Sequence, residues 1–367
     1  MRYKIGIDAS ILSIKPTGIS NYIIPFIVEL SKNSDIEIIL FSNNPLNEKV
    51  LEKISDIRNI KTNIKSFPII NKLLFWFIFQ LPILVRREKL DVFWGPSHYI
   101  PFFLPKKIKK IVTYHDLIFR LFPKESHSGS LIRGFAFCRY SLNASDIILS
   151  VSEETKKQII HFYGVGPSKI KVCHGGVNKD MFKKIENFSY FEQLKKQYGL
   201  RDKFAIFVST LEPRKNVNFL IKVFEELNKI DVDMDIAIVG MKAWGGNMLF
   251  DREYIKVLGY VSDQELVELY NKAYFCIIPS LYEGFGLVSL EAAASNCAVI
   301  AANNSATKDI SRNYALLIDG YDIDKWVESI KKLNDLELKI MKEKGLIESS
   351  KYDWKKCSDQ FLEVIKD

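Results

Sequence analysis

Two glutamates and two glycines lie close together in this chain, in a stretch well suited to hold a ligand. Residues 274–278 are apolar and predict a strand, Gly284 and Gly286 lie in the loop that follows, and residues 287–294 predict a helix. Glycines let backbone N–H groups approach a ligand closely, and the unpaired amides of a helix N-terminus favour an anion such as a phosphate. The sequence therefore predicts a phosphate site at this loop.

The acidic side chains of this stretch are Glu283, in the loop, and Glu291, inside the predicted helix. A carboxylate repels a phosphate at close range, so we expect both glutamates to accept hydrogen bonds from neutral hydroxyl groups, as on a sugar or a ribose. Ordinary helix capping would also place a glutamate here. The residues alone leave the two interpretations open.

Two adjacent cations, Arg214 and Lys215, lie between a strand predicted at 204–208 and a helix predicted at 217–227. Arg offers a forked contact and Lys a point charge, and this combination suits a diphosphate. Solvated cations at the start of a helix are also common, so this alternative stays open at this point.

Two further candidates follow predicted strands in the first half of the chain. His115 follows a strand at 110–114, and Gly18 lies in the turn between a strand at 3–9 and a helix at 21–30. In parallel sheets with helices on both faces, ligands bind outside the carboxyl ends of the strands. A lone His is more often structural, but its place at a strand end favours a role in facing a ligand.

Strands and helices alternate along the chain, which predicts an α/β protein with mostly parallel sheets. With 367 residues, the chain is long for one core and sufficient for two domains. Its composition, 47% hydrophobic and 26% charged, excludes extensive disorder. We expect a first domain over residues 1–184, a second over 185–350 and an amphipathic C-terminal helix within 351–367.

The charge is unevenly distributed. Residues 1–184 hold 28 Lys and Arg against 15 Asp and Glu, a balance of +13, whereas the remainder holds 24 against 29, a balance of −5. A basic first half favours an anionic partner such as a membrane surface or a phosphorylated acceptor. Nucleic acid ranks last, because no recognition motif accompanies the charge. The candidates for a basic patch are Arg86, Arg87, Lys106, Lys107, Lys109 and Lys110.

Residues 73–85 form an intensely apolar segment just before two arginines. The segment contains Gln80 and Pro82 and is shorter than the roughly 20 apolar residues that cross a membrane. It predicts either a buried core helix or a helix that rests on a membrane interface, and both remain open. The N-terminus does not resemble a secretory signal, and the five scattered cysteines form no C-x-x-C pair, which predicts a cytoplasmic protein without a metal site.

The setting of the two glutamates, E-G-F-G-L-x-x-L-E-A over residues 283–292, is similar to the signature of the retaining glycosyltransferases of family 4, which have the two-domain GT-B architecture. Four further motifs resemble the family in the same order, so the resemblance covers nearly the whole chain. They are T-x-H-D-L at 113–117, G-G-V-N at 175–178, T-L-E-P-R-K-N at 210–216 and G-M-K-A-W-G-G at 240–246.

The resemblance implies two Rossmann-like domains facing a cleft, with the C-terminal helix crossing back to the first domain. The second domain would bind the donor nucleotide sugar and the first the acceptor. Glu283 would hold hydroxyls of the donor sugar, Glu291 the ribose diol and His115 the far end of the sugar. Other members carry an arginine where this chain has Ser209 and Thr210. The implied catalytic residues are His115, Arg214, Lys215 and Glu283, and the implied donor-binding residues are Gly18, Arg214, Lys215, Val261, Glu283, Gly284, Phe285, Gly286, Leu287 and Glu291.

The resemblance further implies retaining transfer of a hexose from a nucleoside diphosphate sugar to a hydroxyl of a lipid-linked or polysaccharide acceptor, without a metal or other cofactor. The T-L-E-P-R-K motif resembles a branch that leans towards mannosyl transfer to bacterial surface polysaccharide such as O-antigen, so GDP-mannose is the first donor to try. The expected place is the cytoplasm, at the inner membrane. The alternatives are an epimerase or phosphorylase of the same fold, or a non-catalytic sugar-nucleotide-binding protein, because several motif positions are substituted.

Overall fold

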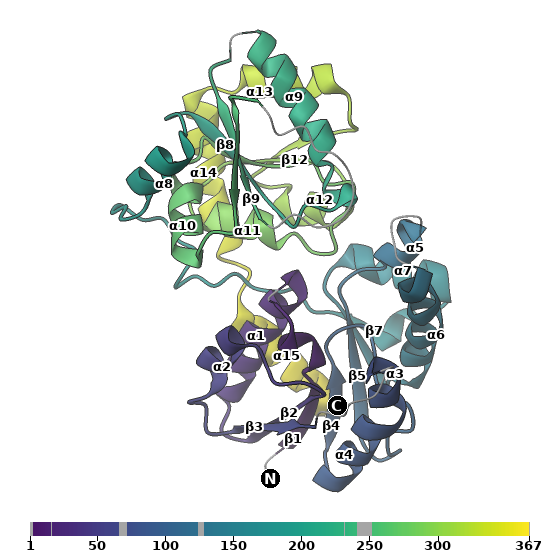
Figure 1. The fold of residues 1–367 in the computed structure, drawn as a ribbon. Helices are drawn as coiled ribbons and strands as arrows, with labels where there is room; N and C mark the ends of the chain where they lie inside the picture. The colour runs from purple at the N-terminus through teal and green to yellow at the C-terminus, as the bar shows by residue number, and fades with distance from the viewer. Residues whose placement is uncertain are drawn as a thin grey trace. The chain divides into compact units, whose positions relative to one another are not determined.

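The computed structural model describes residues 3–15, 17–65, 72–123, 128–230, 232–240 and 252–366. The chain forms two compact α/β units (Figure 1). The first contains residues 1–176 together with 354–367, and the second contains residues 177–353.

The first unit is built on a seven-stranded parallel sheet with the strand order β3-β2-β1-β4-β5-β6-β7. The chain adds strands in one direction from β1 and in the other from β4, so the direction switches between these two neighbours. A switch point of this kind leaves a crevice at the carboxyl ends of the two strands, where ligands of such sheets bind. The strands are β1 (Tyr3–Asp8), β2 (Ile36–Ser42), β3 (Ile60–Ile64), β4 (Val92–Gly95), β5 (Lys109–Tyr114), β6 (Ile147–Ser150) and β7 (Ile170–Val172).

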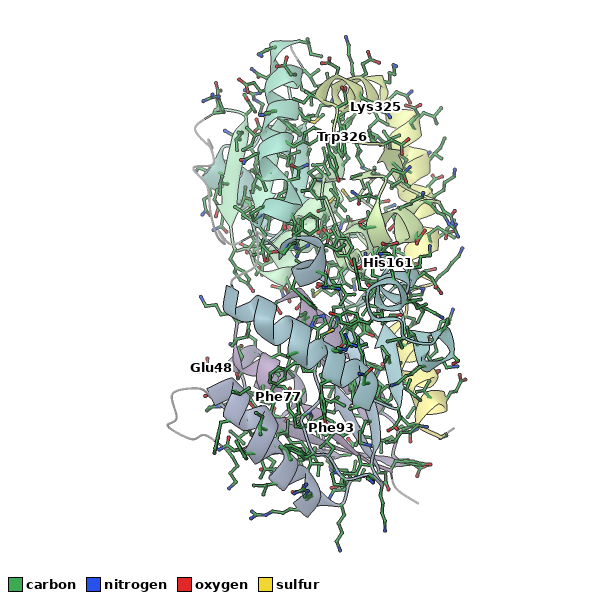
Figure 2. All side chains as sticks on the ribbon, turned by 90° about the vertical axis from the view of Figure 1, so that its right-hand side faces the viewer. Glu48, Phe77, Phe93, His161, Lys325 and Trp326 are labelled. Atoms are coloured by element: carbon green, nitrogen blue, oxygen red, sulfur yellow. The ribbon has the colours of Figure 1, made fainter. Side chains whose placement is uncertain are left out.

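Helices cover both faces of this sheet, with α1, α2 and α15 on one side and α6 and α7 on the other (Figure 1). Phe77 and Phe93 lie in the core of this unit (Figure 2). The helices are α1 (Gly18–Ser31), α2 (Glu48–Ile54), α3 (Lys72–Phe75), α4 (Leu81–Glu88), α5 (Ile118–Leu121), α6 (Ser128–Ala144), α7 (Glu153–Tyr163) and α15 (Trp354–Lys366), with 3-10 turns at Ser10–Ser13 and Pro167–Lys169.

The C-terminal helix α15 packs on the first unit, as predicted. The ring of Phe361 lies 5.5 Å from Phe26 and 5.2 Å from Trp94, and Trp354 lies 5.3 Å from Tyr22. These edge-on and tilted aromatic contacts anchor the helix to α1 and β4.

The apolar segment 73–85 is helical and faces both the core and the surface. A π-helical turn, Trp76–Gln80, joins α3 to α4. Trp76 and Leu81 are fully buried, whereas Phe79 is 54% exposed. The segment is therefore a core helix on one side only. In the described part of the chain, no helix has the length and apolar character needed to span a membrane.

The second unit has a six-stranded parallel sheet with the order β10-β9-β8-β11-β12-β13, and its switch point lies between β8 and β11. Trp326 lies in its core, while the neighbouring Lys325 is exposed (Figure 2). Helix α9 packs beside α13, and α11 beside α14. The strands are β8 (Phe204–Val208), β9 (Asp235–Val239), β10 (Ile255–Gly259), β11 (Phe275–Ile278), β12 (Val299–Ala302) and β13 (Leu316–Ile318). The helices are α8 (Phe191–Tyr198), α9 (Val217–Lys229), α10 (Asp263–Lys272), α11 (Leu287–Ala294), α12 (Ser305–Ser311), α13 (Ile323–Lys332) and α14 (Asp335–Ser349), with a 3-10 turn at Pro213–Lys215.

One sequence-based expectation needs correction. Gly18 was expected in a turn before a helix, but α1 begins at Gly18, because Thr17 and Ser20 form a reciprocal capping box that starts the helix three residues early. Strand β10 ends at Gly259, and Val261 lies in the segment between β10 and α10.

Candidate functional site

The two loops that follow β8 and β11 meet at the switch point of the second unit. The backbone N–H of Leu281 donates to the carbonyl of Arg214 at 2.8 Å, which ties the loops together. Beside them, a Cβ atom at Gly240 would lie 1.8 Å from the carbonyl oxygen of Ser209, so only glycine permits this approach of β9 to the loop after β8. Most of the glycine-rich stretch at 240–246 lies outside the described residues.

Arg214, Lys215 and Glu283 form one charged cluster in these loops. Nζ of Lys215 lies 2.6 Å from Oε1 of Glu283, and Nη1 of Arg214 lies 3.5 Å from Oε2 of Glu283. Nε of Arg214 donates to Glu212 at 2.8 Å. Separate roles were expected for the cations and for Glu283, but the fold brings them together, because β8 and β11 are neighbours in the sheet.

Burial governs the electrostatics of this cluster. Only 8% of Lys215 is exposed, and burial lowers its pKa more than the attraction of Glu283 raises it. Burial alone would raise the pKa of Glu283, but the charges of Lys215 and Arg214 together outweigh it, so the pKa of Glu283 lies below its ordinary value. The cluster therefore holds an ionised carboxylate between two cations.

Sequence reasoning did not identify the polar residues that fix Glu283. Oγ of Ser280 donates to Oε1 of Glu283 at 2.7 Å, and the N–H of Glu283 donates to Oγ of Ser305 at 3.0 Å. Asn304 and Tyr321 both donate to the carbonyl of Ser280, at 3.0 and 2.8 Å. The one available signal was a serine three residues before the glutamate. Asn304 and Ser305 lie at the start of α12 and Tyr321 just before α13, so spacing could not link them to Glu283.

Helix α11 begins at this cluster. Its N-cap, Gly286, has φ 110 and ψ 37, a conformation that strains any residue with a side chain, and among the described residues no side chain caps the helix. The positive end of the helix dipole favours an anion at this point, and the phosphate site predicted from Gly284 and Gly286 stays a prediction. Phe285 and Leu287, on either side of Gly286, complete the turn, and Phe285 is buried against Tyr352.

Glu291 lies on α11, near enough to the start of α10 to feel the charge of Asp263, two residues beyond Val261. Burial, together with the charge of Asp263 at the start of α10, raises the pKa of Glu291 to about 8. Within the described residues, the carboxyl group of Glu291 makes no hydrogen bond, and its side chain is partly exposed. The raised pKa leaves this carboxyl group largely protonated at neutral pH, and its expected role in binding ribose hydroxyls stays a prediction.

In the first unit, two histidines lie at the ends of neighbouring strands β4 and β5. Nε2 of His115 lies 2.7 Å from the carbonyl of Pro96, and burial together with nearby His98 lowers the pKa of His115 to about 4. The N–H groups of His115 and Asp116 donate to Nε2 of His98, at 3.2 and 3.4 Å. Both rings are therefore neutral at neutral pH. Sequence reasoning missed His98, which stands four residues beyond Trp94 without a motif to mark it.

Gly18 and Asp8 flank the loop after β1 in the same unit. A Cβ atom at Gly18 would meet nothing within 4 Å, so the position is open. Asp8 is buried and accepts hydrogen bonds from Ser10 and from Nε1 of Trp76, at 2.6 and 3.3 Å. This aspartate links the site end of β1 to the apolar segment 73–85.

Comparison with known proteins gives consistent findings over almost the entire chain. Residues 16–181 match the family described as Glycosyltransferase Family 4, and residues 190–353 match the family described as Glycosyl transferases group 1.

Individual relatives extend this comparison. The O-antigen chain mannosyltransferase RfbU of Salmonella typhimurium is 26% identical over 349 residues, covering 90% of this chain and 91% of that protein. The O-antigen chain mannosyltransferase B of Escherichia coli is 26% identical over 293 residues, covering 77% and 76%. The crystal structure of Anabaena Alr3699/HepE in complex with UDP-glucose has a TM-score of 0.75 at 16% identity and covers 100% of both chains. This last likeness concerns the fold.

Proposed function

We propose, on the premise that this chain belongs to the group 1 glycosyltransferases of family 4, that it moves a hexose from a nucleoside diphosphate sugar to an acceptor hydroxyl with retention of anomeric configuration. The observation that carries the proposal is the cluster of Arg214, Lys215 and Glu283 beside the uncapped start of α11. Two cations, the backbone amides of a helix start and a carboxylate that can accept hydrogen bonds from hydroxyls lie together at the switch point of the parallel sheet. Ligands of doubly wound parallel sheets bind at this point.

Breaking the bond between the anomeric carbon and the diphosphate oxygen leaves an oxocarbenium-like sugar and a leaving group with increased negative charge. Lys215, Arg214 and the amides after Gly286 stabilise that charge, which is preorganised electrostatic catalysis without a metal. The acceptor oxygen then attacks the same face of the sugar, and its proton passes to the departing phosphate oxygen. Glu283 accepts hydrogen bonds from hydroxyls of the donor sugar.

Without ligand, the carboxylate of Glu283 neutralises the charge of Lys215. The cluster therefore has little net positive charge, and we expect it to bind free phosphate only weakly. When the diphosphate enters, the lysine contact shifts towards phosphate oxygen, and the carboxylate becomes available to the sugar. Glu291 holds the ribose diol, the base lies near Val261, and His115 contacts the far end of the sugar with a neutral ring.

The names of two relatives support the choice of sugar and acceptor in this proposal. Two proteins that match most of this chain are named O-antigen mannosyltransferases, which supports mannose as the transferred sugar, GDP-mannose as the donor and a lipid-linked or polysaccharide acceptor. An acceptor of this kind is assembled on a membrane, so we place the protein on the cytoplasmic face of the inner membrane, in peripheral contact with anionic lipid.

The test begins with a thermal-shift screen against GDP, UDP, dTDP and ADP and their sugars, and then compares Lys215→Ala with Lys222→Ala, an exposed lysine on α9. We expect Lys215→Ala to lower kcat/KM for GDP-mannose by a factor of about 100 or more, and the control to leave it unchanged. Full transfer by Lys215→Ala at subsaturating donor would contradict the assignment. Analysis of the products formed without acceptor distinguishes a transferase from an epimerase. Measurable turnover with acceptor distinguishes an enzyme from a protein that only binds the nucleotide sugar.

A further inference from the structure

The helical segment from α3 to α4 exposes apolar side chains along its outer side. Phe79 is 54% exposed and Ile83 is 47% exposed, and a spacing of four residues places them on one helix face. The ring of Phe75 lies 5.3 Å from that of Phe79 and extends the face by one turn. Side chains of this size are usually turned inward, so a row of them marks an interaction surface.

Phe103 adds a third exposed aromatic or aliphatic side chain to this surface. Its side chain is 66% exposed, and its backbone has φ 57, a left-handed conformation that costs a bulky residue on the order of 1 kcal/mol. The guanidinium of Arg86 donates to the carbonyl of Phe103 at 3.0 Å and holds this loop against the last turn of α4. The unit thus maintains a strained backbone that presents an aromatic ring to the outside. We call Phe79, Ile83 and Phe103 the outer apolar face.

Four exposed cations lie close in sequence to the outer apolar face. Arg86 and Arg87 end helix α4, and Lys106 and Lys107 follow Phe103 by three and four residues; all four are exposed. The acidic residue at this end of α4, Glu88, pairs with Lys4 at 3.0 Å. The local balance is therefore strongly positive, within a first half of the chain that carries +13 over residues 1–184.

The inner side of the same segment is fixed to the core. Nε1 of Trp76 donates to Asp8 at 3.3 Å, and the N–H of Phe102 donates to the carbonyl of Phe77 at 3.1 Å. Trp76 and Phe77 are both buried. The outer apolar face is therefore held in place before any partner arrives, so that little ordering entropy opposes docking.

We propose that the outer apolar face and its four cations form a docking surface for an anionic lipid bilayer. Apolar side chains enter the boundary between headgroups and acyl chains, and the cations contact the phosphates around them. Complementary charge favours this occupant over a neutral protein partner. The inference rests on the proposed function in one respect: a lipid-linked acceptor presents its hydroxyl at such a surface.

The experiment measures sedimentation of the full-length protein with vesicles of phosphatidylcholine, with and without phosphatidylglycerol. The triple variant Phe79→Ser, Ile83→Ser, Phe103→Asn should lower the partition coefficient by about tenfold or more. Asn tolerates the left-handed conformation, so the variant keeps its fold, as thermal unfolding will verify. The matched control is Leu336→Ser with Ile347→Ser on α14, whose side chains are 67% and 62% exposed, and we expect it to bind as the unmodified protein does.

Charge is tested separately with Arg87→Gln, Lys106→Gln and Lys107→Gln. Each should reduce partition about fivefold on vesicles with phosphatidylglycerol and leave partition on phosphatidylcholine alone unchanged. The exposed Lys339→Gln, on α14, is the control. Added salt should reduce the extra partition that phosphatidylglycerol gives over phosphatidylcholine alone, because salt screens charge–charge attraction.

Equal partition of the triple variant and its control would overturn the proposal. A triple variant that turns a dimer into a monomer in sedimentation velocity, with unchanged vesicle binding, would overturn it too, by assigning the face to self-association. Transfer to a soluble saccharide acceptor is measured in parallel without vesicles, where the triple variant should retain full rate. Specific vesicle binding without any transfer would contradict the proposed function and support this inference.

Discussion

Replacing Glu291 by Gln should have opposite effects on stability and on nucleotide binding. Burial raises the pKa of Glu291 to about 8 from an ordinary value of 4.5. Below pH 4.5 the carboxyl is protonated in both folded and unfolded chains. Between pH 4.5 and 8 the unfolded chain has lost a proton that the folded chain retains, so stability falls as pH rises; above 8 the loss is complete.

One pKa unit corresponds to about 1.4 kcal/mol, so the full penalty above pH 8 is at most about 5 kcal/mol. Because solvent reaches part of the side chain, we expect about 1–3 kcal/mol. Glu291→Gln removes this penalty. Relative to the unmodified protein, its Tm should be higher at pH 9 than at pH 5 by roughly 3–8 °C.

The assay is thermal unfolding at pH 5 and pH 9 for the unmodified protein, Glu291→Gln and the control Glu343→Gln, an exposed position on α14. Calorimetric titration with GDP follows at pH 7 and pH 8.5. If the ionised carboxylate holds the ribose, the affinity of the unmodified protein should rise about tenfold over this range, because less of the site is protonated. Glu291→Gln should bind about tenfold more weakly and without that rise. Equal pH dependence of Tm in all three proteins, or unchanged affinity in the variant, would refute the reasoning and leave Glu291 as a helix residue.

Three further outcomes are expected. Because the pKa of His115 is about 4, the ring stays neutral above pH 5.5, so His115→Gln should lower kcat/KM more than tenfold without shifting the pH profile between 6 and 8; a shift would contradict the neutral ring. Glu268→Ala should lower the free energy of unfolding by about 2–4 kcal/mol, measured by urea titration, because its carboxylate accepts three backbone N–H groups at 189–191; a loss below the error of the titration would contradict this. Phe361→Ala should lower the free energy of unfolding of the first unit by about 3–5 kcal/mol, measured by calorimetry. If the unfolding transition of the first unit keeps its temperature, α15 does not stabilise the core of that unit.

Hydrophobic periodicity predicted those elements that are buried and regular. Strand β8 and helix α11 have the bounds that the sequence predicts, and α15 lies within the range expected for the last helix. Strand β3 was missed because its sequence, IKTNI, places three polar residues between two isoleucines at the edge of the sheet and lacks an apolar run. The early start of α1 depends on the capping pair Thr17 and Ser20, which a pattern of apolar residues does not reveal.

The site was predictable in its residue types but not in its pairings. Spacing identified Glu283, Gly284 and Gly286 because they lie in one loop. Lys215 is 68 residues away from Glu283, and their contact depends on β8 and β11 being neighbours, which is a property of strand order. The apolar segment 73–85 shows the same limit. Its residues are apolar on both helix faces and a π-helical turn interrupts the helical spacing, so the sequence does not show which side chains are buried.

The first unit takes its last helix from the far end of the chain, and this determines the order in which a growing polypeptide can be finished. Residues 177–353 are continuous and precede α15 in the chain, so the second unit has all its strands before the first unit has its last helix. Until the final thirteen-residue helix emerges, Tyr22, Phe26 and Trp94 lack the aromatic partners that cover them. The half of the molecule that is synthesised first is the half that matures last.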